Sequence, residues 1–287
     1  MNHDILTLIQ ENIHTFSKGQ KRIANFILES YDKAAFMTAS RLGKRVGVSE
    51  STVVRFAAEL GYDGYPDMQR SLQKMIRNRL TYVQRIEVTN DRIGDQDLLS
   101  MVLQSDIENI RYTLEELDRE NFESAVDALV SARKIYLVAA RSSSSIATFL
   151  YFYLNLIFDN VVTVTASTAG DPCDQLWRVG EKDVVLGISF PRYSSRTVQG
   201  MTFARNRGAT TIAITDSEAS PLVPICTYVL KARSQMASFV DSLVAPLSLM
   251  NALLVAVSRK KNSELPGTFQ NLEQIWDEYG IYEKVQE

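Results

Sequence analysis

The stretch that most constrains the fold is residues 38–61, TASRLGKRVGVSESTVVRFAAELG, in which two short helical patterns meet at a tight turn. The first pattern runs from Ala39 to about Val46 and ends at Gly47, because glycine takes the left-handed conformation without steric cost. Ser49 can cap the second pattern, whose apolar residues recur at i, i+3, i+4 and i+7. That stripe consists of Val53, Phe56, Ala57 and Leu60. The pattern predicts a helix-turn-helix.

The other face of the second helix carries short hydroxyl side chains and one arginine. Its candidate base-reading residues are Ser49, Ser51, Thr52 and Arg55. Such side chains at the start of a protruding helix suit the major groove of DNA. The first helix adds candidate phosphate contacts at Arg41, Lys44 and Arg45. A plain helical hairpin with a solvated charged face is the alternative, but the Gly-Val-Ser turn favours a helix-turn-helix.

Length and charge agree with a small basic domain joined to a larger acidic one. A chain of 287 residues allows about two domains, and 45% apolar residues suffice for ordinary cores. Residues 1–85 carry 13 Lys and Arg against 8 Asp and Glu, a net charge of +5, and the remainder carries −8. A basic N-terminal part suits a partner that is a polyanion such as double-stranded DNA.

Several classes of protein are not expected from this sequence. Cys173 and Cys226 are far apart, without a CxxC motif or nearby histidine, so we expect free thiols, no metal site and no cofactor. The first ten residues lack the basic and apolar regions of a signal peptide. Polar residues interrupt the apolar runs 146–158 and 242–258, so both predict buried helices and not membrane spans. We therefore expect a cytoplasmic protein with no membrane partner.

The N-terminal part is predicted to be an all-α helix-turn-helix domain over residues 1–80. Three further helices are expected at about 5–13, at 18–30 with Ser17 as its cap, and at 66–80 opened by Pro66. Tyr62 and Tyr65 are expected to cover the small core. Residues 81–96 are polar without a sustained period, and we predict a linker there.

The C-terminal part is predicted to be an α/β domain over residues 97–262, followed by a helical tail over 263–287. Helices are expected at about 97–117, 121–132, 143–158, 170–179, 195–207, 220–226 and 240–257. The expected strands are Ile135–Ala139, Val161–Thr165, Val184–Ser189, Thr211–Thr215 and Tyr228–Leu230. Apolar strands alternating with helices predict a five-stranded parallel sheet in a three-layer αβα arrangement. The apolar helix 240–257 exceeds what one monomer buries, which predicts a homodimer or tetramer.

Two predicted strands end in segments rich in serine, each with an arginine. The first segment provides Arg141, Ser142 and Ser143, and the second provides Ser189, Arg192, Ser194 and Ser195. Ligands of parallel sheets bind at the strand C-termini, where helix N-termini attract anions. Arginine can hold a phosphate or carboxylate through two hydrogen bonds. Serines that only cap helices are the alternative, but two such segments together favour an anion site.

These features together resemble those of RpiR-type bacterial transcriptional regulators. The strand, serine loop and helix, with a second strand ending Ile188-Ser189, resemble a SIS (sugar isomerase) domain, and a helix-turn-helix followed by LGYDGYPDMQRSL precedes it. The resemblance implies a dimeric regulator of carbohydrate metabolism genes whose DNA affinity is controlled by a phosphosugar effector. It assigns the first-loop serine of the family to Ser143 and the second-loop hydroxyls to Ser189 and Ser194.

Both loops depart from the family pattern. The first loop of the family has Gly-x-Gly before its serine, where this chain has Ala139 and Arg141, and the second has Ser-x-Ser-Gly, where this chain has SFPR. We hypothesise that Arg141 and Arg192 replace amide contacts with guanidinium contacts. The effector is then a phosphosugar or another doubly anionic metabolite such as a sugar-acid phosphate.

A phosphosugar isomerase is the competing interpretation. Isomerisation needs a base, usually Glu or His. His3 and His14 lie in the first helical segment, neither loop contains a glutamate, and Glu181 and Glu218 fall in polar turns. We therefore expect no catalytic residues and no enzyme activity. A nucleic-acid-binding protein whose sheet domain only dimerises is a third possibility.

Overall fold

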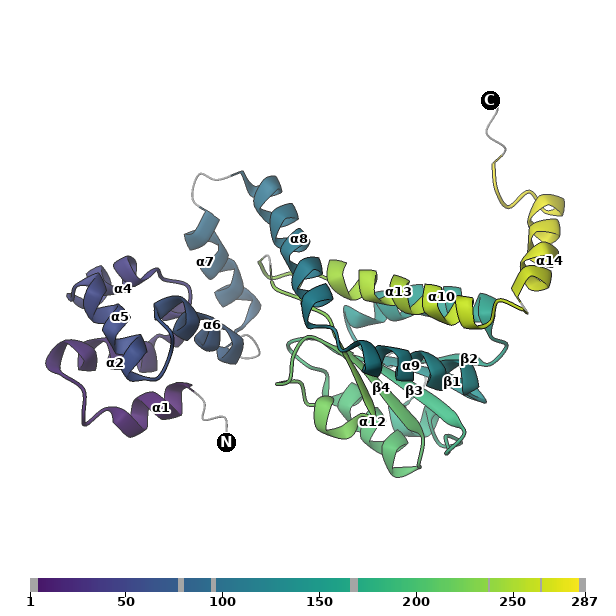
Figure 1. Cartoon of the computed structure of the whole chain (residues 1–287), viewed down its shortest axis with the longest axis horizontal. Helices are drawn as coiled ribbons and strands as arrows, with labels where there is room; N and C mark the ends of the chain where they lie inside the picture. Colours follow the sequence, from purple (N-terminus) through teal and green to yellow (C-terminus); the bar gives the residue numbers. More distant parts are fainter. Residues whose placement is uncertain are drawn as a thin grey trace. The chain divides into compact units, whose positions relative to one another are not determined.

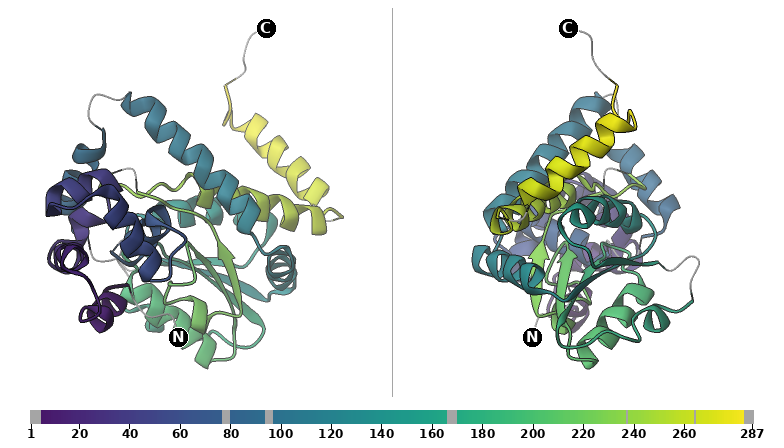
Figure 2. Two further views of the ribbon diagram at one scale, coloured as in Figure 1. Left: turned by 60° about the vertical axis from the view of Figure 1, so that its left-hand side comes forward. Right: turned by 90° about the vertical axis from the view of Figure 1, so that its right-hand side faces the viewer.

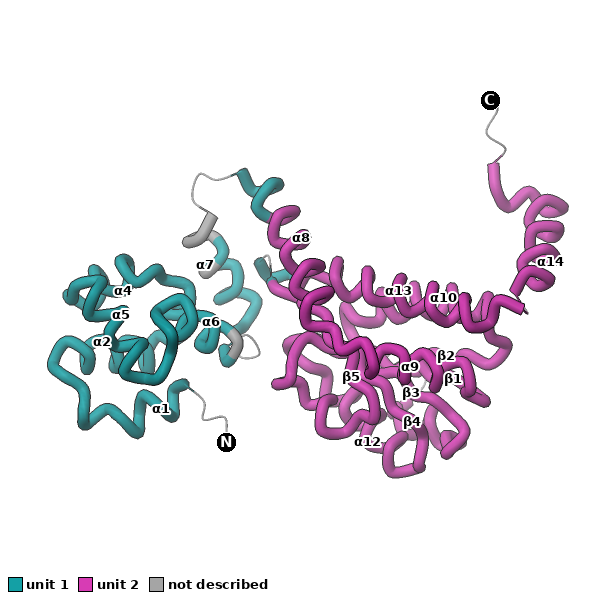
Figure 3. Tube along the Cα trace, in the orientation of Figure 1, with its two compact units in different colours: residues 1–101, 236–240 teal, residues 102–235, 241–287 magenta. Residues whose placement is uncertain are grey.

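The computed structural model describes residues 5–76, 80–93, 97–165, 170–236, 238–263 and 265–283. It divides into two units, which Figure 3 colours separately. Unit 1 comprises residues 1–101 with 236–240, and unit 2 comprises residues 102–235 with 241–287.

Unit 1 is a bundle of helices around one apolar core. Its helices are α1 (Ile5–Asn12), α2 (Lys18–Glu29), α3 (Tyr31–Ala34), α4 (Ala39–Val46), α5 (Glu50–Glu59), α6 (Tyr65–Ile76) and α7 (Tyr82–Ile93). Ser17 begins α2 with a capping box, in which its hydroxyl accepts from the Gln20 amide and the Gln20 side chain accepts from the Ser17 amide. The core includes the predicted stripe of α5, and Tyr62 and Tyr65 pack against it as expected.

The polar segment 81–96, for which we predicted a linker, contains helix α7, which the sequence pattern did not predict. Thr81 and Gln84 form a reciprocal cap: the Thr81 amide donates to Gln84 Oε1 at 3.0 Å, and the Gln84 amide donates to Thr81 Oγ1 at 3.3 Å. Gln84 Nε2 also donates to Asp32 at 3.1 Å. Polar contacts rather than an apolar stripe hold α7, which explains why periodicity did not reveal it. The domain boundaries themselves stay predictions.

Unit 2 is built on a five-stranded parallel sheet in the order β2-β1-β3-β4-β5. The strands are β1 (Lys134–Ala139), β2 (Val161–Thr165), β3 (Asp183–Ile188), β4 (Thr210–Thr215) and β5 (Tyr228–Lys231). Its helices are α9 (Arg119–Ser131), α10 (Ser143–Ile157), α11 (Pro172–Gln175), α12 (Ser195–Asn206), η1 (Val223–Ile225), α13 (Val244–Lys260) and α14 (Leu265–Glu278), and α8 (Leu98–Glu116) precedes them. The five predicted strands are confirmed to within one residue at each end.

Side chains that alternate along the strands form two apolar layers. Figures 1 and 2 show helices on both faces of the sheet. On β1, Ile135 and Leu137 pack with α9, α10 and α13. Tyr136 and Val138 pack on the other face with residues around α11 and α12. The fold is thus an αβα sandwich as expected, although α11 is shorter than the predicted helix 170–179 and only η1 forms within 220–226.

Candidate functional site

The helix-turn-helix in unit 1 is fixed by its caps and by one glycine contact. Thr38 Oγ1 accepts from the Arg41 amide at 3.2 Å, and Gly47 ends α4 with a left-handed φ of +73°. The Val48 amide donates to the Gly43 carbonyl at 2.9 Å. A Cβ added at Gly43 would lie 2.8 Å from the Val48 carbonyl oxygen, so the turn folds back on α4 only because residue 43 has no side chain.

The hydroxyl groups predicted to contact bases lie close together at the first turn of α5. Ser49 Oγ lies 2.9 Å from Ser51 Oγ and 2.8 Å from Thr52 Oγ1, and it accepts from the Thr52 amide at 3.3 Å. Arg55 Nε donates to the Ser51 carbonyl at 3.3 Å. Ser49, Ser51 and Arg55 are exposed and Thr52 is half-buried. All four therefore border one accessible surface at the N-terminus of the helix.

The predicted phosphate contacts on α4 are also accessible. Arg41, Lys44 and Arg45 are exposed, and together with Met37 they line an open hollow of about 470 Å³. Sequence reasoning missed one further basic residue, because Arg22 lies in a separate helix. Its Nη1 donates to the Gly47 carbonyl at 3.4 Å, which brings a guanidinium to the turn itself.

The two serine-rich segments of unit 2 begin side by side at one edge of the sheet. Ala139 at the end of β1 pairs with Ile188 at the end of β3, so the following residues, Ala140 and Ser189, start at neighbouring positions. From there α10 crosses to β2 over one face, and α12 crosses to β4 over the other. This point of divergence is where parallel sheets bind ligands.

The first segment has an unusual backbone at Arg141. Its φ of +59° is the one positive φ among the described residues that are not glycine. The Arg141 carbonyl accepts from the Ser144 amide at 3.0 Å, and Ser142 precedes α10 without a side-chain capping bond. Arg141 and Ser142 are exposed, whereas Ser143 is buried with 6% exposure.

The second segment uses its serines partly to build its own loop. Ser189 is buried, and its hydroxyl accepts from the Ser194 amide at 3.2 Å. Ser194 caps α12 by accepting from the Thr197 amide at 3.5 Å, as the capping alternative expects. Arg192 and Ser195 are exposed. The effector-binding role of these residues stays a prediction.

Two further features of this edge were missed by sequence reasoning. Tyr193 donates its hydroxyl hydrogen to Asp216 Oδ1 at 2.7 Å, and Asp216, directly after β4, is buried with 6% exposure. Thr197 is buried, and its hydroxyl has no hydrogen-bond partner among the described residues. The position of an aspartate directly after an apolar strand was the available signal for Asp216.

The parts of the chain that the structure describes contain no group of three His, Cys, Asp or Glu side chains that could hold a metal ion. In the same residues, no helix has both the length and the apolar composition of a membrane span.

Burial raises the pKa of the Cys226 thiol to about 12, so this cysteine is a poor nucleophile.

Two family models match the chain in the order of its units. Residues 3–79 match the helix-turn-helix domain of the rpiR family, and residues 128–256 match the SIS domain. An HTH-type transcriptional regulator of Haemophilus influenzae is 26% identical over 249 residues, which is 79% of each chain. The regulator HexR of Escherichia coli is 25% identical over 232 residues, covering 79% of this chain and 77% of HexR.

Solved structures show the same architecture. The sugar isomerase domain of an RpiR transcription factor from Sphaerobacter thermophilus is 28% identical with a TM-score of 0.59, covering 62% of this chain and 99% of that domain. Vibrio vulnificus NanR complexed with ManNAc-6P is 21% identical with a TM-score of 0.58, covering 96% of this chain and 98% of NanR, and this likeness concerns the fold alone. Fold and motif together define a DNA-binding transcriptional regulator with a SIS domain. Within that class, the chain belongs to the RpiR family.

Proposed function

We propose that this regulator controls carbohydrate metabolism genes in response to a phosphosugar or sugar-acid phosphate bound at the C-terminal edge of β1 and β3. The observation that carries the proposal is the pairing of Ala139 with Ile188, which starts two serine-rich loops beside each other. Each loop leads into a helix N-terminus and holds an exposed arginine, Arg141 or Arg192. Backbone amides at the positive ends of two helices, with two guanidinium groups, suit a ligand that carries a phosphate.

The chemistry of the edge also suggests how the rest of the ligand is bound. Asp216 accepts a hydrogen bond from Tyr193 in this structure, and a carboxylate has further acceptor capacity for sugar hydroxyls. The NanR structure contains ManNAc-6P, and the Sphaerobacter domain is described as a sugar isomerase domain. The NanR ligand agrees with a sugar phosphate as the ligand class here, and the description of the Sphaerobacter domain agrees with a sugar.

On the DNA side, we propose that α5 enters the major groove and α4 contacts phosphates. A cytoplasmic homodimer, alone or paired into a tetramer, would present two such helices to a palindromic operator. The ligand can change operator affinity only by the difference between its affinities for the free and DNA-bound arrangements.

A thermal-shift screen of phosphosugars and sugar-acid phosphates, each beside its dephosphorylated form, tests the ligand. We expect only phosphorylated compounds to raise the melting temperature. The Arg192→Ala variant should lose most of that rise, whereas Arg259→Ala, an exposed arginine in the last turn of α13, should keep it. An equal response of wild type and Arg192→Ala would remove Arg192 from the site.

An isomerase assay with the same compounds addresses the alternative function. We expect no turnover, because neither serine-rich loop contains a histidine or glutamate that could serve as the base. Turnover at rates typical of enzymes would contradict the proposed function.

A further inference from the structure

Helix α8 presents a stripe of large apolar side chains to solvent. Leu103, Ile107, Ile110 and Leu114 follow one another at spacings of four, three and four residues. Their exposed fractions are 53%, 58%, 39% and 62%. Single exposed apolar residues are ordinary on protein surfaces, but four aligned along one helix mark an interaction surface.

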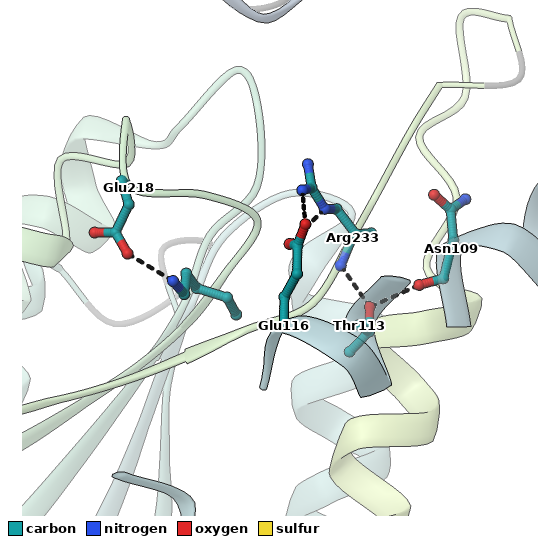
Figure 4. A network of polar contacts seen from close by, with 6 residues as sticks. Asn109, Thr113, Glu116, Glu218 and Arg233 are labelled. Carbon is teal, nitrogen blue, oxygen red and sulfur yellow. Dashed lines mark hydrogen bonds and ion pairs between the residues drawn. The ribbon is translucent and has the colours of Figure 1, made fainter. Parts of the chain in front are cut away.

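Another side of α8 contacts its own unit through polar groups, which Figure 4 shows. Thr113 Oγ1 accepts from the Arg233 amide at 2.8 Å and donates to the Asn109 carbonyl at 2.7 Å. The Arg233 guanidinium forms an ion pair with Glu116. Asn109 is only 1% exposed, and its side-chain amide has no hydrogen-bond partner among the described residues. The helix thus packs on unit 2 by a polar face, and its apolar stripe is left outside that contact.

The spacing of the stripe is that of a coiled-coil seam. Leu103 and Ile110 occupy d positions, and Ile107 and Leu114 occupy a positions, of a seven-residue repeat. We propose that the α8 helices of two copies of this chain pair in parallel through this seam. The inference concerns assembly and does not depend on which ligand the SIS domain binds.

Charge complementarity supports a second copy of α8 as the partner that covers the stripe, and a parallel orientation of the two helices. Asp106 lies at a g position and Arg111 at the e position five residues later. In a parallel pair the g residue of one helix meets the following e residue of the other, so Asp106 faces Arg111 of the second copy on both sides. An antiparallel pair would bring g next to g and e next to e, without these two attractions.

The existing contacts of these two residues leave room for such pairs. Arg111 is 4.0 Å from Glu115 in an exposed ion pair, which contributes little. Asp106 accepts from the Ser242 hydroxyl through Oδ1, and a carboxylate can accept several bonds. Parallel pairing also places the N-termini of both α8 helices at the same end of the pair. Two DNA-binding domains that bind one palindromic operator require this, because each domain precedes α8 in the chain.

Sedimentation velocity of the full chain tests the seam. We expect Ile107→Asp to raise the dissociation constant of the dimer at least about tenfold, because two charges would be buried at the centre of the seam. The matched control is Leu98→Asp, which changes an exposed apolar residue (52%) on the same helix outside the stripe and should leave the dimer intact. If Ile107→Asp lowers the melting temperature but sediments with the same molecular mass as the wild-type dimer, the proposal would be overturned, because the stripe would then pack within one chain.

Cysteine cross-linking tests the orientation, with the wild-type chain and its two native thiols as the baseline. We expect Ile110→Cys to form a disulfide with itself under mild oxidation, and a mixture of Leu103→Cys and Leu114→Cys to form no mixed disulfide. A mixed disulfide between Leu103→Cys and Leu114→Cys, with no self-linked Ile110→Cys, would overturn the parallel arrangement. Absence of any cross-link above the baseline would overturn the pairing itself.

Discussion

Arg141 combines an unfavourable backbone conformation with a position beside the candidate anion site. A left-handed conformation costs a residue with a Cβ roughly 1–2 kcal/mol relative to glycine. The SIS pattern has glycine at this place, whereas Arg141 keeps the left-handed φ of +59° and bears an exposed guanidinium. Strain at such a loop is explained if the side chain supplies binding energy to a ligand.

Replacing Arg141 with glycine should separate stability from binding. We expect Arg141→Gly to stabilise the protein by about 0.5–1 kcal/mol, since the relieved strain exceeds the added entropy of the unfolded chain. The same change should weaken phosphosugar binding about tenfold, because a charge-assisted contact is lost. Urea denaturation and calorimetric titration measure the two effects, and Arg192→Ala is the control that weakens binding without relieving strain. Unchanged ligand affinity would contradict the assigned role.

The stability of unit 1 should depend on pH through the buried side chain of Tyr65. Its hydroxyl donates to the Met37 carbonyl at 2.6 Å, to which Gln69 Nε2 also donates at 2.8 Å. Burial raises the pKa of Tyr65 from 10.0 to about 12. Since the folded state favours the neutral phenol, this contribution to stability is complete below pH 10 and is lost as the pH rises through about 12.

We therefore expect Tyr65→Phe to cost about 1 kcal/mol at pH 8, because Gln69 still satisfies the carbonyl. The difference in stability between wild type and Tyr65→Phe should shrink between pH 10 and pH 12. Urea denaturation at several pH values measures this, with Gln69→Leu as a variant whose cost should not follow the titration of Tyr65. A constant difference for Tyr65→Phe up to pH 12 would contradict the effect.

The two helices of the DNA-binding motif depend on one close backbone approach. Gly43 lets the turn after α4 pack directly on that helix, and the turn sets the direction in which α5 leaves. Every candidate base-reading residue lies on α5 or at its cap. The geometry of this element therefore depends on Gly43, which is not one of the candidate DNA-binding residues.

A methyl group at position 43 should disrupt this element. We expect Gly43→Ala to destabilise unit 1 by about 2 kcal/mol, because its Cβ would lie 2.8 Å from the Val48 carbonyl oxygen and both groups belong to the backbone. Gly19→Ala is the matched control, since its Cβ would make ordinary contacts of 3.5 Å with Thr52 and Val48. Chemical denaturation measures both, and equal stability of the two variants would show that the turn can adjust.

The two faces of the motif should differ in how they contribute to DNA binding. We expect Arg55→Ala to weaken operator binding more than binding to unrelated DNA, by about 1–3 kcal/mol, if Arg55 contacts bases. Arg45→Ala should weaken both and lower the salt dependence, as loss of a phosphate contact does. Gel-shift titrations at several salt concentrations measure this. An equal loss on both DNAs for Arg55→Ala would make Arg55 a phosphate contact.

At the scale of the molecule, charge and chemistry are divided between the units. The basic N-terminal part carries the helix-turn-helix, and the acidic C-terminal part carries the sheet and the candidate ligand site. The proposed control by an effector would require a free-energy coupling between a site on each unit, which is typically about 1–3 kcal/mol. The α8 seam would provide a symmetric assembly through which two copies act on one operator.

Such coupling must be reciprocal. If a phosphosugar changes operator affinity by some factor, operator DNA must change phosphosugar affinity by the same factor, which we expect between about 5 and 150. Titrating the ligand with and without operator DNA, and the operator with and without ligand, measures both factors. Unequal factors would indicate a second ligand site or a change of assembly, and a factor of one would contradict effector control.

Local sequence was sufficient for the five strands, for most of the helices and for the DNA-binding motif, but not for α7 or for the length of α11. Gly47, Ser49 and Ser17 act as caps through bonds to residues within a few positions, and apolar runs define strands regardless of where the chain goes next. The two candidate ligand-binding loops could also be predicted from local sequence. Residues that directly follow a strand of a parallel sheet lie at its C-terminal edge, where ligands bind.

Only the tertiary structure decided features that depend on residues far apart in sequence. The bond between Tyr193 and Asp216, the burial of Ser143 and Ser189, and the polar contacts that hold α7 arise from elements brought together by folding. The outward direction of the α8 stripe is of the same kind, since periodicity predicts an apolar side but not what covers it. Periodicity and capping are set by neighbours along the chain, whereas burial and partners are set by neighbours in space.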